Sequence, residues 1–208
     1  MEKIIFYDVD TQNDFMRKDG ALYVQGAEEI YQNLEALTKH ALKKGINIFG
    51  SVDRHYDKDA ELEIFPPHCM NSTEGQKKVL ETTVEESEYI ENRRYYTQEI
   101  DSKLRAKAVY FEKQDTKVFS NANAELLGKY NAAVVYGVAT DYCVKEAVLG
   151  MRKRGIEVFV VKDAIKGVAP ETSEDALKSM KEAGAEFVTT KDLLEGKLES
   201  LLREKGGY

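Results

Sequence analysis

Six short apolar runs, each followed by polar or charged residues, alternate with longer segments whose apolar residues recur every three or four positions. The runs lie at about 4–9, 46–52, 108–112, 132–136, 156–161 and 185–188. Runs this short, and rich in Val, Ile and Phe, are typical of strands buried on both faces. Strands that alternate with amphipathic helices predict a parallel sheet covered by helices on both sides. We therefore expect an α/β three-layer sandwich with a central, mostly parallel six-stranded sheet, formed by a single domain over residues 1–208.

The segments between the runs predict the helices. Apolar residues recur at helical spacing over 30–42, and Gly45 follows as a stop signal. Further helices are expected over 75–80, 123–130, 143–151, 173–183 and 193–202. Residues 82–94, in contrast, are rich in Glu and Arg without an apolar period. They predict a solvated excursion, with a flap over the ligand crevice or an oligomer contact as alternatives.

The bulk properties exclude several classes of protein. The 208 residues carry a formal net charge of -7, with 42% hydrophobic and 32% charged residues, which is an ordinary globular composition. No basic cluster suggests a nucleic acid partner, and we expect neither a membrane span nor a signal peptide. The two cysteines form no Cys-x-x-Cys pattern, so we expect free thiols and a cytoplasmic protein. The Gly-x-Gly-x-x-Gly fingerprint of dinucleotide-binding folds is absent.

A cysteine occupies a chemically favourable position after the fourth run. Cys143 lies between the buried run 132–136 and a segment with helical periodicity. Backbone N–H groups at the start of a helix stabilise a thiolate, which is the nucleophilic form of cysteine. A small buried cysteine that packs against the start of a helix explains the same pattern equally well. The turn by itself leaves both interpretations open.

Two charged residues occupy the equivalent position after other runs. Asp10 ends the first run and Lys113 follows the third. Because the carboxyl ends of parallel strands meet at one edge of a sheet, we expect Asp10, Lys113 and Cys143 to lie together. A turn-forming aspartate and a solvated lysine are the alternatives. The combination favours a nucleophilic cysteine, with an ammonium that stabilises the thiolate and a carboxylate that carries the proton.

Such a set is suited to hydrolysis of an amide. The sulfur attacks the carbonyl carbon, the carboxylate passes the thiol proton to the leaving amine, and water then cleaves the thioester. The backbone N–H groups of Ala139 and Cys143 are placed to hold the oxyanion. The sequence thus predicts acyl transfer through a thioester.

The loop after the second run collects two of the three histidines. Possible metal ligands in this loop are Asp53, His55, His68 and either Glu61 or Glu63. Carboxylates and neutral imidazoles suit Zn, Fe(II) or Mn(II) better than Ca. Incidental surface histidines are the alternative, but the bunching of ligand types at a strand end favours one divalent metal ion. The third histidine, His40, lies on a predicted helix and is expected to be a surface or half-buried residue.

These motifs resemble a known superfamily. Isochorismatase-like cysteine hydrolases carry an Asp/Lys/Cys signature, which the chain resembles at 10–15 (Asp-Thr-Gln-Asn-Asp-Phe), Lys113 and 137–144 (Gly-Val-Ala-Thr-Asp-Tyr-Cys-Val). Within that superfamily, Asp53-x-His55 and 65–69 (Phe-Pro-Pro-His-Cys) resemble the metal loop of the nicotinamidases (pyrazinamidases). The resemblance covers essentially the whole chain. It implies an isochorismatase-like fold of Rossmann-like topology and the hydrolysis of nicotinamide to nicotinate and ammonia in NAD salvage.

The resemblance also implies a role for individual residues. These are the catalytic Asp10, Lys113 and Cys143, the oxyanion donors Ala139 and Cys143, the metal ligands Asp53, His55, Glu61 and His68, and the substrate contacts Phe15, Phe65, Gln12 and Tyr142. The metal, Zn, Fe or Mn, would bind the pyridine nitrogen of the substrate. A cis Val138–Ala139 peptide would turn the Ala139 N–H into the oxyanion hole. We expect a small amide as substrate and a homo-oligomer.

Two departures from the nicotinamidase pattern concern the substrate. The chain has no Trp, so Phe65 takes the place of the Trp that precedes Pro-x-His in many nicotinamidases. Residues 114–120 lack the Tyr-Ser-Ala-Phe type of pattern often found after the lysine. One alternative is therefore another cysteine hydrolase of the superfamily, acting on a carbamoyl or ureido amide, or an isochorismatase, which generally lacks the metal loop. A non-catalytic α/β binding protein is disfavoured by the intact Asp10, Lys113 and Cys143 set.

Overall fold

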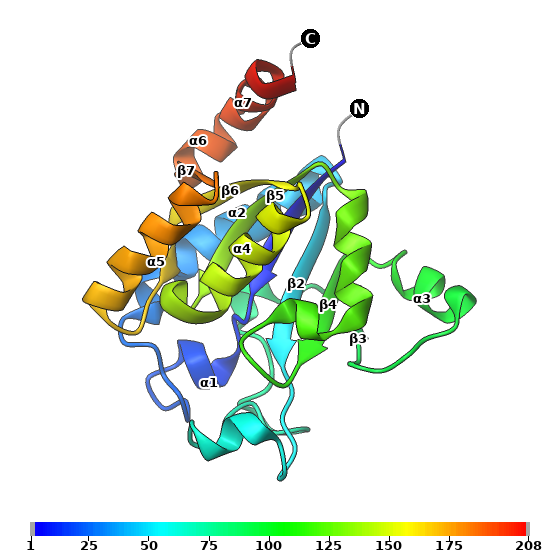
Figure 1. Cartoon of the computed structure of the whole chain (residues 1–208), viewed down its shortest axis with the longest axis vertical. Coiled ribbons are helices and arrows are strands. Elements are labelled where there is room, and N and C mark those ends of the chain that lie inside the picture. The colour runs from blue at the N-terminus through cyan, green and yellow to red at the C-terminus, as the bar shows by residue number, and fades with distance from the viewer. Residues whose placement is uncertain (1–2, 207–208) are drawn as a thin grey trace.

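One parallel sheet organises the computed structural model, which describes residues 3–206. The strands run in the order β3-β4-β2-β1-β5-β6-β7, and each neighbouring pair is parallel. They are β1 (Ile4–Val9), β2 (Asn47–Asp53), β3 (Ser87–Ile90), β4 (Ala108–Lys113), β5 (Ala132–Val138), β6 (Glu157–Lys166) and β7 (Glu186–Val188). Helices cover both faces of this sheet, which confirms the predicted α/β architecture (Figure 1).

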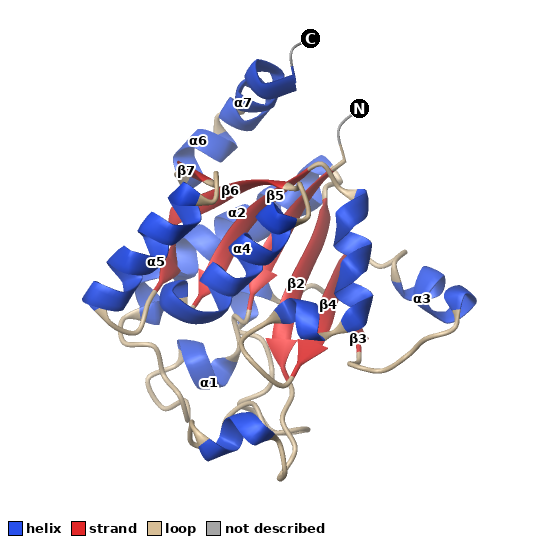
Figure 2. Ribbon diagram, in the orientation of Figure 1, coloured by secondary structure: helices blue, strands red, loops and turns tan. Residues whose placement is uncertain are grey.

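The helices divide between the two faces. They are α1 (Asn13–Met16), α2 (Tyr31–Lys44), α3 (Thr97–Lys103), α4 (Lys145–Lys153), α5 (Pro170–Glu182), α6 (Thr190–Leu194) and α7 (Lys197–Gly206). In Figure 2, α4 and α5 lie in front of the sheet and α2 lies behind it. Two buried apolar clusters result, one built with α4 and α5 and the other with α2, α6 and α7. None of the helices within residues 3–206 has the length and apolar character needed to cross a bilayer.

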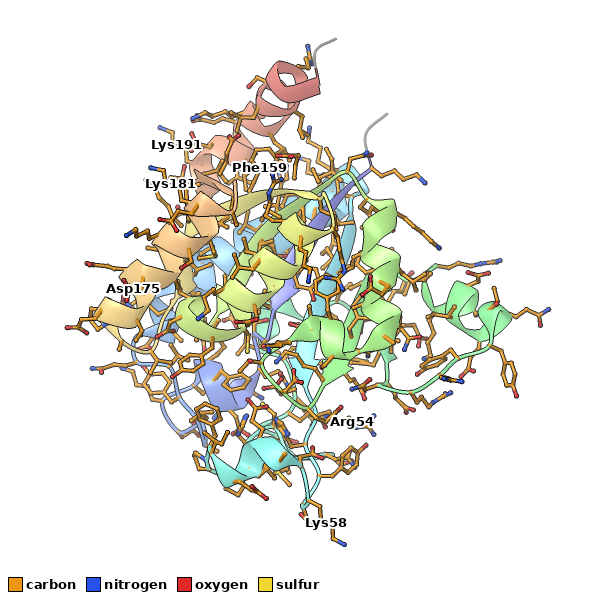
Figure 3. All side chains as sticks on the ribbon, viewed as in Figure 1. Arg54, Lys58, Phe159, Asp175, Lys181 and Lys191 are labelled. Atoms are coloured by element: carbon orange, nitrogen blue, oxygen red, sulfur yellow. The ribbon has the colours of Figure 1, made fainter. Side chains whose placement is uncertain are left out.

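Shorter helical turns connect these elements. Turns of 3-10 helix lie at Ala27–Ile30, Ala60–Glu63, Leu80–Thr82, Val118–Ser120 and Ala122–Lys129, and one π-helical turn spans Thr140–Val144. The outer surface of the helical layer is charged, with Asp175 and Lys181 exposed on α5 (Figure 3). The helical positions therefore follow the amphipathic pattern expected of elements with one buried face.

The sheet has seven strands, so the prediction of six was wrong. The additional strand, β3, lies in the charged segment that predicts a solvated excursion. It pairs only with β4, at the edge of the sheet, and Lys103 binds the half-exposed Glu88 within it. Because an edge strand tolerates and often carries charged residues, it shows none of the continuous apolar character of the central strands.

Two helix predictions also differ from the structure. Residues 75–80 form turns and an isolated antiparallel bridge between Gln12 and Lys78 instead of a helix. The C-terminal helix is divided into α6 and α7 at Gly196, whose φ of 84° is accessible to glycine without steric cost.

The strand order places the candidate site. Four adjacent strands, β4, β2, β1 and β5, end at the same edge of the sheet. Strand β1 lies between β2, the next strand along the chain, and β5, which follows much later. Ligands of open α/β sheets bind outside the carboxyl ends of the strands at such a reversal of strand order. Asp10 follows β1 and Cys143 follows β5, so both lie at this reversal.

Candidate active site

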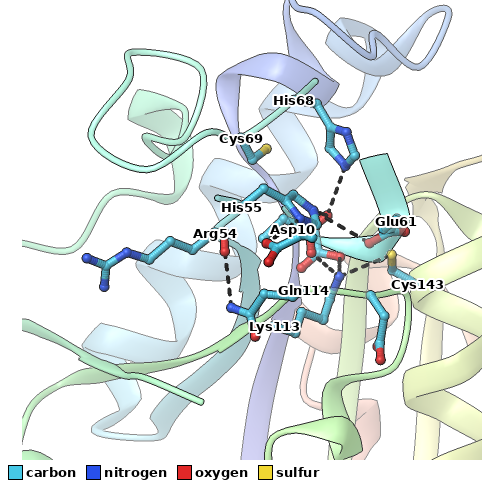
Figure 4. A network of polar contacts seen from close by, with 12 residues as sticks. Asp10, Arg54, His55, Glu61, His68, Cys69, Lys113, Gln114 and Cys143 are labelled. Carbon is cyan, nitrogen blue, oxygen red and sulfur yellow. Dashed lines mark hydrogen bonds and ion pairs between the residues drawn. The ribbon is translucent and has the colours of Figure 1, made fainter. Parts of the chain in front are cut away.

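Lys113 lies at the centre of a buried polar cluster formed by the strand ends. Its Nζ atom is 2.9 Å from Asp10 Oδ2 and 3.4 Å from Cys143 Sγ (Figure 4). The same ammonium also forms an ion pair with Asp53 Oδ1, since Lys113 and Asp53 are register partners in β4 and β2. Cys143 is 9% exposed, and the other three residues are 2% exposed or less. The tertiary structure therefore brings Asp10, Lys113 and Cys143 together, as the sequence predicts.

Burial has the largest effect on the ionisation of the Cys143 thiol. It raises the pKa of the Cys143 thiol well above its usual value, and the opposing effect of Lys113 is smaller. Burial would lower the pKa of Lys113, but Asp10 and Asp53 raise it well above the ordinary lysine value, so Lys113 stays charged. Lys113 lowers the pKa of the Cys143 thiol, as the sequence predicts, but burial outweighs this effect. The thiol therefore stays protonated until a base removes its proton.

Asp10 has the position and the ionisation expected of that base. Burial raises the pKa of its carboxyl group, against the opposing effect of Lys113. Beyond the neighbouring Lys113 and Cys143, no described residue donates a hydrogen bond to its carboxylate oxygens. Its backbone has a φ of 46° and its N–H donates to the carbonyl of Ser51, which turns the chain out of β1 at this point. The carboxylate is thus buried and free to exchange a proton with the sulfur.

The Cys143 turn, residues 137–144, is held by hydrogen bonds within the turn and to the segment before α5. The Val138–Ala139 peptide is cis, as the resemblance implies. The carbonyl of Ala139 accepts hydrogen bonds from the N–H groups of Tyr142 and Val144. The buried Asp141 carboxylate accepts hydrogen bonds from the Val168 and Ala169 N–H groups, which fastens the turn to the segment just before α5. The position of Cys143 therefore depends on β5, α4 and α5 together.

Four potential metal ligands converge beside the cysteine. The ligand cluster consists of Asp53, His55, Glu61 and His68, whose ligand atoms all lie within 4.8 Å of one another. His55 Nε2 is 3.5 Å from Glu61 Oε2, and His68 Nε2 is 3.6 Å from Asp53 Oδ2. Glu63 is exposed and lies outside the cluster, so the geometry favours Glu61 over Glu63.

The donor set of the ligand cluster fits a divalent metal ion. His55 Nε2 and Glu61 Oε2 are buried and have no hydrogen-bond partner. The opposite ring nitrogens are held, because His55 Nδ1 lies 3.2 Å from Asp59 Oδ2 and His68 Nδ1 lies 2.8 Å from the Pro66 carbonyl. Acceptors on Nδ1 orient both imidazoles and leave Nε2 unprotonated for a metal. Two imidazoles and two carboxylates suit Zn, Fe(II) or Mn(II).

Sequence reasoning missed the two groups that orient these histidines. Asp59 follows His55 by four residues, and this spacing was the only available signal in a loop rich in acidic residues. The Pro66 carbonyl belongs to the backbone and leaves no trace in residue types. His40 lies away from the cluster on α2, where its ring faces Phe6 with a centroid separation of 6.1 Å.

A cavity of about 110 Å³ lies in front of the sulfur and the ligand cluster. Its lining includes the polar side chains of Cys143, Asp10, Asp53, Glu61 and His68. Three of the residues expected to contact substrate, Phe15, Phe65 and Tyr142, line it as well, together with Leu22, Tyr23, Val24, Thr116, Val138, Ala139 and Val168. A small planar molecule with one polar group would fit such a cavity, since its walls are mostly apolar.

One predicted substrate contact, Gln12, does not line the cavity. Its side chain is fully buried outside the cavity lining, where it binds backbone groups of Asp53 and Gln76. These hydrogen bonds use both ends of the amide, so no substrate contact remains for it. The expected role of Gln12 is thus corrected by the structure.

Comparisons with known proteins agree with the fold. The Isochorismatase domain family model matches residues 5–192. The nicotinamidase/pyrazinamidase of Mycobacterium tuberculosis is 25% identical over 86% of this chain and 95% of its own length. An isochorismatase family protein, PncA of Bacillus subtilis, is 27% identical over 76% of this chain and 82% of its own length. The crystal structure of Pyrococcus horikoshii pyrazinamidase in complex with zinc superposes with a TM-score of 0.73 at 26% identity, covering 90% of this chain and 99% of that one.

Fold, site and relatives together define an enzyme, a hydrolase of the amidase type. Within that class, the chain belongs to the isochorismatase family, since the family model covers most of its length.

Proposed function

We propose that this protein is a metal-dependent nicotinamidase that converts nicotinamide to nicotinate and ammonia through a thioester on Cys143. The observation that carries the proposal is one cavity lined by both Cys143 and the ligand cluster, with Asp10 and Lys113 in contact behind them. Relatives that carry the nicotinamidase/pyrazinamidase name, one of them with zinc, support the same assignment.

The first half of the reaction transfers the acyl group to sulfur. Asp10 takes the thiol proton, and the sulfur attacks the carboxamide carbon to form a C–S bond. Lys113, 3.4 Å from the sulfur, stabilises the transient thiolate. The carbonyl oxygen gains the negative charge, and the N–H groups of Ala139 and Cys143 are proposed to hold it. Collapse of this intermediate breaks the C–N bond, and Asp10 returns its proton to the nitrogen, which leaves as ammonia.

The second half releases the acid. Asp10, again ionised, takes a proton from a water molecule that attacks the thioester carbon. The C–S bond breaks, the Cys143 sulfur recovers the proton from Asp10, and the product leaves as nicotinic acid, which releases its remaining proton to the solvent as it becomes nicotinate. Because both half-reactions start from an ionised Asp10 and end with one, the cycle balances with water as its co-substrate.

The ligand cluster is assigned to substrate binding. Asp53, His55, Glu61 and His68 would hold one divalent ion of Zn, Fe or Mn, which would supply a coordination position for the pyridine nitrogen. The rings of Phe15 and Phe65 both lie near the His68 ring, at centroid separations of 5.4 and 6.3 Å, and all three residues line the cavity. We propose that these rings pack on the pyridine and direct its carboxamide toward the sulfur. A place in NAD salvage in the cytoplasm, a homo-oligomeric state and a single domain over residues 1–208 complete the proposal.

An ammonia-release screen tests this function. The substrates are nicotinamide, pyrazinamide and a set of carbamoyl and ureido amides, each offered to the wild-type protein and to Cys143→Ala. We expect turnover of nicotinamide and pyrazinamide that disappears in the variant. Turnover confined to the ureido compounds would instead assign another amidohydrolase activity of the same family.

A further inference from the structure

We propose that Gln12 is a positioning residue that holds Asp53 in the geometry needed to bind the metal. This inference rests on the proposed metal site and deepens it. Gln12 Oε1 accepts a hydrogen bond from the Asp53 N–H at 2.6 Å, and Gln12 Nε2 donates to the Asp53 carbonyl at 2.7 Å. One side-chain amide thus pairs with both backbone groups of a single ligand residue.

The sheet leaves this position open for Gln12. Asp53 is the last residue of β2 and pairs with Lys113 of β4 on one side. On its other side β1 provides no partner, because the β1–β2 pairing ends at Val9 and Ser51. Buried backbone N–H and C=O groups without partners are costly. The Gln12 amide takes the place that a further residue of β1 would have filled.

The same residue also holds the returning arm of the metal loop. Gln12 Nε2 donates a second hydrogen bond to the Gln76 carbonyl at 2.8 Å, and the Gln12 backbone forms a bridge with Lys78. Asp53 precedes the loop and Gln76 follows His68, so Gln12 fastens both ends of the segment that carries the ligand cluster. Full burial of its side chain limits alternative rotamers. Partners that orient a metal ligand typically change metal affinity by about 10- to 100-fold when they are removed.

The test compares Gln12→Glu with a matched control. Gln12→Glu keeps the shape of the side chain but turns an acceptor toward the Asp53 and Gln76 carbonyls. The control is Asn121→Asp, since Asn121 is also fully buried and its Nδ2 donates to the carbonyls of Ile90 and Glu112, at 3.0 and 2.9 Å. We expect both changes to destabilise the fold, but only the first acts on a residue of the ligand cluster.

Two measurements separate positioning from general destabilisation. They are the Zn²⁺ affinity, by competition with a chromophoric chelator, and the rise in Tm on addition of Zn²⁺. We expect Gln12→Glu to lose at least about tenfold in Zn²⁺ affinity and most of the Zn²⁺-dependent rise in Tm. We expect Asn121→Asp to lower the Tm without Zn²⁺ and to keep the wild-type affinity. Gln12→Met, which removes the donors without adding charge, serves if the glutamate variant does not fold.

The outcomes distinguish this inference from the proposed function. Wild-type affinity in both Gln12 variants, or an equal loss in Asn121→Asp, would overturn the role of Gln12 and leave the metal site intact. Failure of the wild-type protein itself to bind Zn²⁺, Fe²⁺ or Mn²⁺ would overturn the metal site, and with it the role of Gln12.

Discussion

Lys113 Nζ lies 3.4 Å from Cys143 Sγ, and the same ammonium pairs with the carboxylates of Asp10 and Asp53. A single buried cation therefore links the proposed nucleophile, its proton carrier and one residue of the ligand cluster. Two carboxylates this deeply buried need a compensating charge, since an isolated buried charge is costly. The arrangement explains how acid–base groups and metal ligands can share one small cavity.

The two cysteines provide a direct test of the nucleophile. Cys143 lines the cavity, whereas Cys69 is fully buried in the core and does not reach it. We expect Cys143→Ala to abolish measurable ammonia release. Cys69→Ala should keep most activity and lower the free energy of unfolding by about 1 kcal/mol, as expected for a small deletion in the core. The reverse ranking of the two variants would show that the wrong thiol was assigned.

The raised pKa of Asp10 should appear in the pH–rate profile. Asp10 must be ionised to accept a proton, and burial raises its pKa above the ordinary aspartate value of about 3.9. The value of kcat/KM should therefore fall as the pH decreases through this raised pKa, giving an acid limb above about pH 4. Asp10→Asn should lower kcat/KM by about 10²- to 10⁴-fold, the usual effect of losing a general base. An acid limb at or below the ordinary aspartate pKa would contradict this assignment.

Metal removal and histidine substitution test the ligand cluster. His68 is buried, with its Nε2 atom 3.6 Å from Asp53 Oδ2. His40, in contrast, lies on α2 and packs against Phe6 of β1. We expect chelation to abolish activity and added Zn²⁺, Fe²⁺ or Mn²⁺ to restore it. Elemental analysis should find about one metal per chain in the wild type and in His40→Ala, and much less in His68→Ala. Full activity in carefully demetallated protein would rule out a metal-dependent reaction.

Phe65 should contribute to substrate affinity more than to chemistry. Its ring lies 5.9 Å from that of Tyr142 and lines the cavity. Because aromatic packing of this kind is worth about 0.5–1.5 kcal/mol, Phe65→Ala should raise KM for nicotinamide by up to about tenfold, with a smaller change in kcat. Tyr96→Ala is the control, since this side chain is 86% exposed and does not line the cavity. A selective loss of kcat in Phe65→Ala would point to a role in orienting the carboxamide instead.

A second buried ion pair makes a prediction about stability. Lys78 Nζ lies 2.8 Å from Asp8 Oδ2, and both side chains are at most 3% exposed. Lys78→Met leaves the Asp8 carboxylate buried without its cation, which should lower the free energy of unfolding by about 3–5 kcal/mol. The neighbouring Lys77 has a side chain that is 63% exposed, so Lys77→Met should cost at most about 1 kcal/mol. Urea unfolding of both variants measures the difference, and equal losses would disprove the role of the pair.

Much of the fold follows from local patterns. Each central strand is marked by its apolar run, and residue types at the strand ends mark Asp10, Asp53, Lys113 and Cys143 as candidates. Parallel strands then place those ends at one edge of the sheet, because all the strands run in the same direction. Strand β3 was not predicted, because it lies at the edge of the sheet, where burial imposes no apolar pattern on the sequence.

The sequence by itself determined the α/β class, the central strands and the residue types that converge at the site. Only the tertiary structure decided between Glu61 and Glu63 as a member of the ligand cluster and showed the contact of Asp59 with His55. It also showed that Gln12, predicted to contact the substrate, binds the backbone of Asp53 instead. The reason is physical. Periodicity and residue type act over a few neighbouring positions, whereas the contact of Gln12 with Asp53 spans 41 residues and exists only because β1 ends before β2.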